Sequence, residues 1–142
     1  MAIRVLLADD HAIVREGLER MMKVSGIEVV GHADDVDTTW SAYDEYKPDI
    51  LVMDISMPGS TGVDGVKFIR KRDPNAKIVI FSIYENVLLV ERVLDAGAMA
   101  YVAKSSALME IVTAIQMVHK NKTYISLDLA QAMVYSRLEP IQ

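Results

Sequence analysis

The sequence contains no cysteine and no apolar run long enough to cross a membrane. The lack of cysteine excludes disulfides and thiolate metal sites, and it is typical of a cytoplasmic protein. A transmembrane helix needs about 20 consecutive apolar residues, so we expect no contact with a membrane. We expect no secretory leader either, because the first apolar run carries Arg4 and soon reaches Asp9.

An excess of positive charge and a glycine-rich phosphate loop are also missing. The formal net charge is −5, so we do not expect this segment to bind nucleic acid by itself. Neither G-x-x-x-x-G-K-[ST] nor G-x-G-x-x-G occurs, which argues against a nucleotide-binding module. What remains is a globular composition, 51% hydrophobic and 25% charged, in a length that suits one domain.

Apolar runs alternate with segments of helical spacing along most of the chain. Runs this uniformly apolar are typical of strands buried on both faces. Right-handed crossovers would join them into a doubly wound, five-stranded parallel α/β sheet flanked by five helices. The expected strands are residues 3–8, 27–31, 50–53, 78–81 and 99–103, and the helices 14–23, 36–46, 63–72, 87–94 and 108–118.

Two local features concern the C-terminal part of the chain. Ser105 or Ser106 is expected to cap the fifth helix. The pattern changes from Asn121 onward, and we interpret residues 121–142 as a connector. A short helix in it would carry an apolar stripe of Leu127, Ala130, Val134 and Leu138.

Four of the apolar runs end on polar side chains. Asp9 and Asp10 follow the first run, Asp54 the third, Ser82 the fourth and Lys104 the fifth. The carboxyl ends of parallel strands share one edge of the sheet, and ligands of open α/β sheets bind at that edge. We therefore expect three carboxylates, a hydroxyl and an ammonium to meet in one shallow pocket.

This set of groups suits a magnesium ion and a phosphoryl group. The carboxylates would repel one another unless a cation joined them, and Mg²⁺ prefers oxygen ligands. Asp54 comes from the middle of the chain and so from a central strand, where its carboxylate can attack phosphorus and form an acyl phosphate. Lys104 would help to neutralise the phosphoryl charge, and Ser82 would donate a hydrogen bond to it.

The same residues, in their order and spacing, resemble the receiver domain of two-component response regulators. The resemblance covers roughly residues 1–120, and the motifs are highly specific together. The residues that carry it are Asp9-Asp10, Asp54-Ile55-Ser56-Met57-Pro58 with Gly62, Ser82 and Tyr101-Val102-Ala103-Lys104. Three further segments are similar to the NarL/FixJ subfamily, whose members carry a C-terminal helix-turn-helix of the LuxR type: Asp9-Asp10-His11 with Arg15-Glu16-Gly17-Leu18, Lys104-Ser105, and Tyr124-Ile125-Ser126. The family usually has proline after the lysine, where this sequence has Ser105.

The resemblance implies a flavodoxin-like sheet of order 2-1-3-4-5 and a phosphorylation-activated switch. Asp54 would accept a phosphoryl group from a histidine kinase, and Lys104 would contact that group. Ser82 would turn inward to bind it, and Tyr101 would follow into the vacated space. The chain would catalyse only its own phosphorylation and dephosphorylation.

The resemblance also implies a metal site and a domain organisation. Asp10, Asp54 and the backbone carbonyl of Ser56 would bind Mg²⁺ directly, and Asp9 would act mostly through water. Residues 1–120 would form the receiver domain, and 121–142 a linker toward an absent C-terminal DNA-binding domain. The whole would regulate transcription and would dimerise on phosphorylation.

Two other functions remain open. A stand-alone receiver could act by docking to a protein partner. Residues 35–39 (Asp-Val-Asp-Thr-Thr) match the aspartate pair of haloacid-dehalogenase-type phosphatases, which also use an aspartyl phosphate and Mg²⁺. Against that match, Gly31-His32 interrupts the preceding apolar run, and residues 35–39 more naturally start a helix.

Surface residues allow three further interpretations. We interpret His11 as structural or exposed. Leu88 would point outward from the fourth helix and contribute to a partner or dimer contact. The kinase would dock beside the first helix, with Arg15, Arg20 and Lys23 as solvent-facing candidates.

Overall fold

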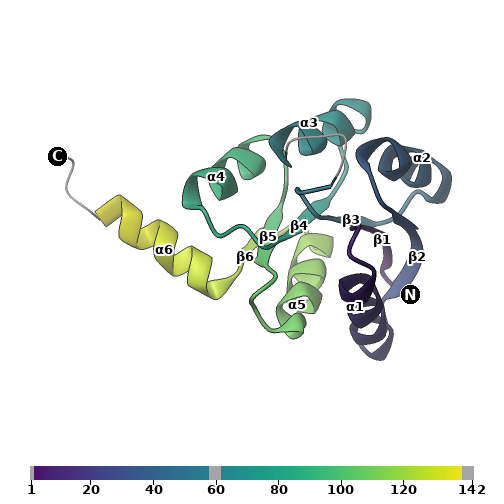
Figure 1. Ribbon diagram of the computed structural model, residues 1–142, viewed down its shortest axis with the longest axis horizontal. Coiled ribbons are helices and arrows are strands. Elements are labelled where there is room, and N and C mark those ends of the chain that lie inside the picture. Colours follow the sequence, from purple (N-terminus) through teal and green to yellow (C-terminus); the bar gives the residue numbers. More distant parts are fainter. Residues whose placement is uncertain (1, 58–61, 139–142) are drawn as a thin grey trace.

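The computed structural model describes residues 2–57 and 62–138, and at its centre lies a parallel sheet in the order β2-β1-β3-β4-β5-β6 (Figure 1). Pro58 of the expected motif and the tail 139–142 lie outside the described residues. The strands are β1 (Arg4–Ala8), β2 (Glu28–Ala33), β3 (Ile50–Met53), β4 (Ile78–Ser82), β5 (Ala100–Ala103) and β6 (Tyr124–Ile125).

Helices cover both faces of the sheet (Figure 1). On one face lie α1 (Ala12–Val24) and α5 (Leu108–His119), and on the other α2 (Val36–Tyr46), α3 (Gly62–Arg72) and α4 (Val87–Asp95). The last helix, α6 (Leu127–Leu138), follows β6 and extends away from the sheet. Among the described residues, no helix has the length and apolarity that a bilayer crossing requires.

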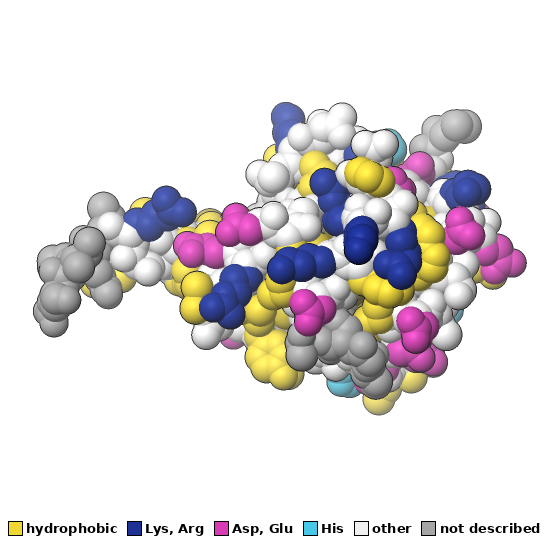
Figure 2. Space-filling view, turned by 90° about the horizontal axis from the view of Figure 1, so that it is seen from above, with side chains coloured by type: hydrophobic (Ala, Val, Ile, Leu, Met, Phe, Trp, Pro, Cys, Tyr) yellow, Lys and Arg dark blue, Asp and Glu magenta, His cyan; other side chains and the backbone are white. Residues whose placement is uncertain are grey.

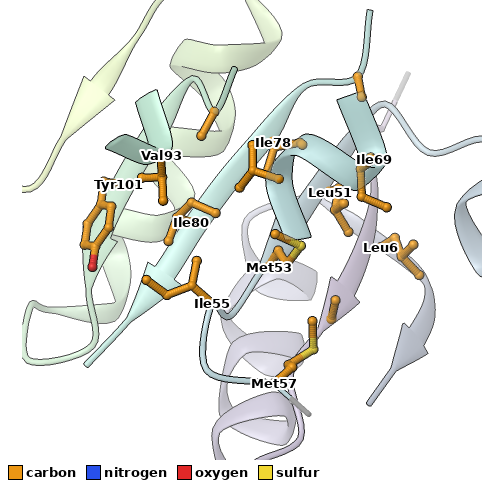
Figure 3. Close-up of a cluster of buried hydrophobic side chains, with 14 of the residues drawn as sticks. Leu6, Leu51, Met53, Ile55, Met57, Ile69, Ile78, Ile80, Val93 and Tyr101 are labelled. Carbon is orange, nitrogen blue, oxygen red and sulfur yellow. The ribbon is translucent and has the colours of Figure 1, made fainter. Parts of the chain in front are cut away.

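Each central strand contributes to two hydrophobic cores, which explains why the runs are apolar without alternation. In β1, Val5 and Leu7 pack with α1 and α5, while Leu6 and Ala8 pack toward the opposite helices. Because successive strand residues point to opposite faces, a sheet covered on both sides needs apolar residues at every position. Figure 3 shows the second core, where side chains such as Ile80 from β4 and Val93 from α4 meet.

The sheet has one strand more than predicted. The α/β fold with a parallel sheet and the order 2-1-3-4-5 of its first five strands are confirmed. The sixth strand, β6, pairs with Ala100 and Tyr101 at the free edge of β5. A strand of two residues is too short to show a hydrophobic period in the sequence. It is recognised only from its pairing with the edge of β5 in the folded protein.

Two predictions about the C-terminal helices are wrong. Ala107, not a serine, occupies the N-cap of α5, and no side chain caps that helix end. Among the α6 side chains that the structure describes, Leu129 is buried and Met133 partly buried, whereas Leu127 and Val134 are exposed. The periodicity predicted a helix correctly but identified the wrong buried face.

The outer surface of the α2–α3–α4 layer is partly basic. The last turn of α3 carries Arg70, Lys71 and Arg72, and Figure 2 shows Lys and Arg side chains gathered on this side of the molecule. The Arg72 guanidinium lies 3.4 Å from the centre of the Phe68 ring. Part of this charge therefore packs on α3 rather than extending into solvent.

Candidate functional site

Asp54 lies directly after β3 at the carboxyl edge of the sheet, where its backbone N–H donates to Ala8 O at 2.8 Å. The residue is only 2% exposed. Its Oδ1 accepts hydrogen bonds from the backbone N–H and the hydroxyl of Ser56, at 2.9 and 2.8 Å. Its Oδ2 accepts one from Lys104 Nζ at 2.9 Å. Both carboxylate oxygens thus have donors although the group is shielded from water.

Lys104 connects Asp54 with Asp9. Its backbone N–H donates to Ser82 O at 2.7 Å, which holds the end of β5 beside the end of β4. Its ammonium lies 2.8 Å from Asp9 Oδ2 and 2.9 Å from Asp54 Oδ2. Asp9 Oδ2 is buried, and it accepts no well-aligned hydrogen bond from the described residues. Its partner is therefore the Lys104 ammonium, through an ion pair. One cation therefore compensates two buried carboxylates from different strands.

The protonation of this pair follows from its contacts. Burial opposes the charged form of Asp54, but the hydrogen bonds from Ser56 and Lys104 outweigh it, so the pKa of Asp54 lies below its usual value. Burial also opposes the charge of Lys104, and the carboxylates of Asp9 and Asp54 outweigh that cost and raise the pKa of Lys104. Both groups are therefore ionised at neutral pH.

Asp10 and His11 complete the cluster from the loop between β1 and α1. Asp10 is exposed, and its Oδ1 lies 3.3 Å from His11 Nδ1. The same nitrogen lies 2.9 Å from Asp9 Oδ1 and 3.4 Å from Asp54 Oδ2. One donor atom from each of these four residues falls within a span of 4.8 Å. A donor set of three carboxylates suits a hard divalent cation.

Ser82 and Tyr101 form a second pair, on the neighbouring strands β4 and β5, and both are fully buried. The Tyr101 hydroxyl donates to Tyr84 O at 2.6 Å, and Ser82 Oγ accepts from the Tyr84 N–H at 3.1 Å. Burial raises the pKa of Tyr101, and a hydrogen bond from the Ser82 hydroxyl opposes that shift. Ser82 and Tyr101 thus both bind the backbone of Tyr84, in the loop after β4.

The structure brings Asp9, Asp10, Asp54, Ser56 and Lys104 into one cluster at the carboxyl edge of the sheet. The carboxylates and the ammonium expected at this edge thus lie together, whereas the Ser82 hydroxyl, also expected there, contacts the Tyr84 N–H instead. The cluster is where a metal ion and a phosphoryl group could be held.

His11 is the residue of this cluster that sequence reasoning missed. Its position directly after Asp9-Asp10 was the available signal, because a residue there can reach the same edge of the sheet. Arg15, predicted to face solvent, instead donates to Asp34 Oδ1 at 2.6 Å and to Asp9 O at 3.2 Å. Arg15 therefore holds the loop that carries the aspartates.

The rival phosphatase motif lies elsewhere. Asp35 is the N-cap of α2, where its side chain and that of Thr38 form a capping box. Hydrogen bonds from Thr38 lower the pKa of Asp35. Asp35 is thus committed to helix capping, as its position at a helix start indicated.

The chain is similar in sequence to known proteins over almost its whole length. The family model described as the response regulator receiver domain matches residues 5–116. The chain is 37% identical over 139 residues to the response regulator GacA of Pseudomonas viridiflava, and 36% identical over 139 residues to UvrY of Escherichia coli K12. Each alignment covers 97% of this chain, which spans 65% of the length of GacA and 64% of that of UvrY.

A solved structure is similar over nearly the whole chain. It is a two-component response regulator of the LuxR family from Aurantimonas sp. SI85-9A1, and it is 37% identical with a TM-score of 0.93. The match covers 98% of this chain and 100% of that one.

Proposed function

This chain belongs to the response regulator receiver domain family, and on that premise we propose that it is a phosphorylation-activated switch with Asp54 as the phosphoryl acceptor. The observation that carries the proposal is the buried Asp54 carboxylate, held ionised by Ser56 and Lys104 at the carboxyl edge of the sheet. A carboxylate in this environment is both nucleophilic and protected from bulk water.

The chain's own residues account for the transfer step. An Asp54 oxygen attacks phosphorus, and the bond between phosphorus and the donor's leaving atom breaks, so the leaving group departs with that electron pair. In a two-component system the donor is a phosphohistidine of a sensor histidine kinase. Lys104 neutralises charge on the transferred group, and Ser82 donates a hydrogen bond to it. The chain would catalyse only its own phosphorylation and dephosphorylation.

A divalent cation fits the same pocket. Asp10, Asp54 and the backbone carbonyl of Ser56 would hold Mg²⁺, with Asp9 acting through water. When bound, Mg²⁺ supplies positive charge that offsets the phosphoryl oxygens and the clustered carboxylates. The support is the donor set of three carboxylates within 4.8 Å.

Ser82 and Tyr101 would respond to the charge that a phosphoryl group adds to Asp54. A phosphoryl group on Asp54 would accept a hydrogen bond from the Ser82 hydroxyl and so draw Ser82 Oγ away from the Tyr84 N–H, which now donates to it and holds the loop after β4. Tyr101, which binds the same loop through Tyr84 O, then repacks with it. Packed interiors have discrete arrangements, so a local change of charge selects between two of them.

The output would be control of transcription in the cytoplasm. We propose residues 1–120 as the receiver domain and 121–142 as a linker toward a C-terminal DNA-binding domain. The support is that the chain aligns with only 65% of the length of a response regulator such as GacA. The sensor kinase would dock beside α1, where Arg20 and Lys23 are exposed.

Intact mass after incubation with acetyl phosphate tests the central proposal. We expect a phosphoryl adduct on the wild type in the presence of Mg²⁺ and none in the presence of a chelator. Asp54→Asn should gain no mass under either condition, and Asp35→Asn is the matched control that should behave as the wild type. An adduct on Asp54→Asn would overturn the assignment.

Phosphorylation is also proposed to favour a homodimer. Leu88 on α4 is 55% exposed, and we propose that it contributes to this contact. We expect Leu88→Ser to reduce association after beryllofluoride treatment, because it removes apolar area from the contact, as measured by analytical ultracentrifugation. Unchanged association of Leu88→Ser would exclude this face.

A further inference from the structure

We propose that His11 supplies an imidazole ligand to the cation site at Asp54, so that the pocket favours nitrogen-binding transition-metal ions over Mg²⁺. The inference rests on the proposed function, since it concerns the same cation. It adds a ligand of a different chemical class to a pocket otherwise made of carboxylates.

The position of one nitrogen atom carries this inference. His11 Nδ1 lies 2.9 Å from Asp9 Oδ1, 3.3 Å from Asp10 Oδ1 and 3.4 Å from Asp54 Oδ2. Metal–ligand bonds to nitrogen and oxygen are about 2.1 Å long, so opposite ligands of one ion stand roughly 4.2 Å apart. The four donor atoms fall within 4.8 Å of one another, so small shifts would place them around a single ion.

The surrounding structure does not engage the imidazole in helix capping. His11 is the N-cap residue of α1, but its side chain makes no capping hydrogen bond. Its backbone is held independently, because its N–H donates to Asp9 Oδ1 at 2.8 Å and its carbonyl accepts from the Arg15 N–H at 3.0 Å. Among the described residues, the polar side-chain partners of the ring all belong to the pocket: Asp9, Asp10, Asp54 and Lys104.

The position of the ring proton decides whether His11 Nδ1 can bind a metal ion. Without a metal ion, Nδ1–H donates to Asp9 Oδ1 at 2.9 Å, because a carboxylate only accepts. In the tautomer protonated on Nε2, the Nδ1 lone pair points among the same carboxylates, where a metal ion would meet it. Lys104 Nζ, 3.3 Å from Nδ1, can only donate hydrogen bonds and so favours that tautomer. The ring is 52% exposed and can adjust to a metal ion.

Ligand chemistry then sets the preference among ions. Imidazole suits the later first-row divalent ions, whereas Mg²⁺ takes oxygen ligands and retains several waters. A pocket with one imidazole and three carboxylates should therefore gain affinity for Co²⁺ through the nitrogen, while its affinity for Mg²⁺ depends on the oxygen ligands alone.

Metal titration of wild type and His11→Phe tests the selectivity. We expect His11→Phe to weaken Co²⁺ binding by about 10–100-fold and to leave the Mg²⁺ dissociation constant unchanged, both measured by isothermal titration calorimetry. His119→Phe, at the end of α5, is the matched control and should bind both ions as the wild type does. Urea unfolding of the variants without metal checks that the fold is retained.

Proton NMR of the Co²⁺-loaded wild type gives a second readout that needs no variant. Ligation through Nδ1 leaves the Nε2–H of His11 in place, so we expect one strongly shifted, exchangeable imidazole resonance. The absence of that resonance, or parallel weakening of Co²⁺ and Mg²⁺ binding in His11→Phe, would overturn the inference.

The outcomes also separate this inference from the proposed function. If Mg²⁺ supports phosphorylation of Asp54 while His11→Phe leaves Co²⁺ binding intact, the inference fails and the proposed function stands. If the wild type binds neither ion and Asp54 gains no phosphoryl group, both fail.

Discussion

At the scale of single residues, the pocket depends on the balance between buried carboxylates and one ammonium. Asp9 and Asp54 are 4% and 2% exposed, and the Lys104 side chain is 9% exposed. A buried ion pair contributes little net stability relative to apolar residues, but loss of one partner leaves an uncompensated buried charge. Lys104 therefore has a structural role beside the one proposed for it in phosphoryl transfer.

Replacing Lys104 tests that balance. We expect Lys104→Met to lower the free energy of unfolding by about 3–5 kcal/mol, because two buried carboxylates lose their cation. Urea denaturation without divalent ions measures it. The control, Lys122→Met at an exposed position, should change the value by less than about 0.5 kcal/mol. Equal stability of Lys104→Met and wild type would contradict the ionic account.

The ionisation of Asp54 makes stability depend on acid pH. Its pKa in the folded state lies below the ordinary value of 3.8. Ionised Asp54 therefore contributes stability that is complete above pH 3.8 and is lost as the pH falls through the folded value. We expect the wild type to lose stability more steeply than Asp54→Asn in this range. Urea midpoints at a series of acid pH values measure the difference, and parallel curves would refute it.

At the scale of elements, the turn between α4 and β5 depends on a glycine. Gly97 has φ of +119°, and a Cβ there would lie 2.6 Å from Arg70 Nε. Arg70 is held in place, since its Nη1 donates to Ala76 O at 3.1 Å. Any larger residue at this position would combine backbone strain with displacement of the Arg70 side chain, which lies against this turn and binds the loop after α3.

Two glycine substitutions should therefore act in opposite directions. We expect Gly97→Ala to lower the free energy of unfolding by about 1–3 kcal/mol, because of strain and contact with Arg70. Gly17→Ala, inside α1 with no atom within 4 Å of its added Cβ, should raise it by about 0.5–1 kcal/mol. Thermal and urea unfolding of both variants measure the signs. A neutral Gly97→Ala would show that the turn relaxes freely.

At the scale of the whole molecule, the segment after α5 is built into the sheet. Ser126 is fully buried; its N–H donates to Tyr101 O at 2.9 Å, and its Oγ accepts from the Ala103 N–H at 2.7 Å. Leu129 in α6 is 2% exposed and packs in the same core as Tyr101. The proposed linker thus begins with residues that bind β5, next to the proposed switch residue.

Shortening the chain tests this integration. A protein ending at residue 120 loses β6 and the burial of Leu129, and we expect its free energy of unfolding to fall by about 2–5 kcal/mol. It retains the whole pocket, so phosphorylation of Asp54 with Mg²⁺ should persist. Urea unfolding and intact mass measure the two quantities, and unchanged stability would show that the sheet is complete without β6.

Sequence and tertiary structure decided different parts of this protein. The sequence by itself determined the five long strands and the helices between them, because each has its own local hydrophobic pattern. It also determined the polar residues that end the strands, because these residues directly follow the apolar runs. Tertiary structure alone decided the pairing of β6, the buried face of α6 and the turn of His11 toward the carboxylates. Those three features depend on which surfaces lie within reach after folding, and no local pattern of residues carries that information.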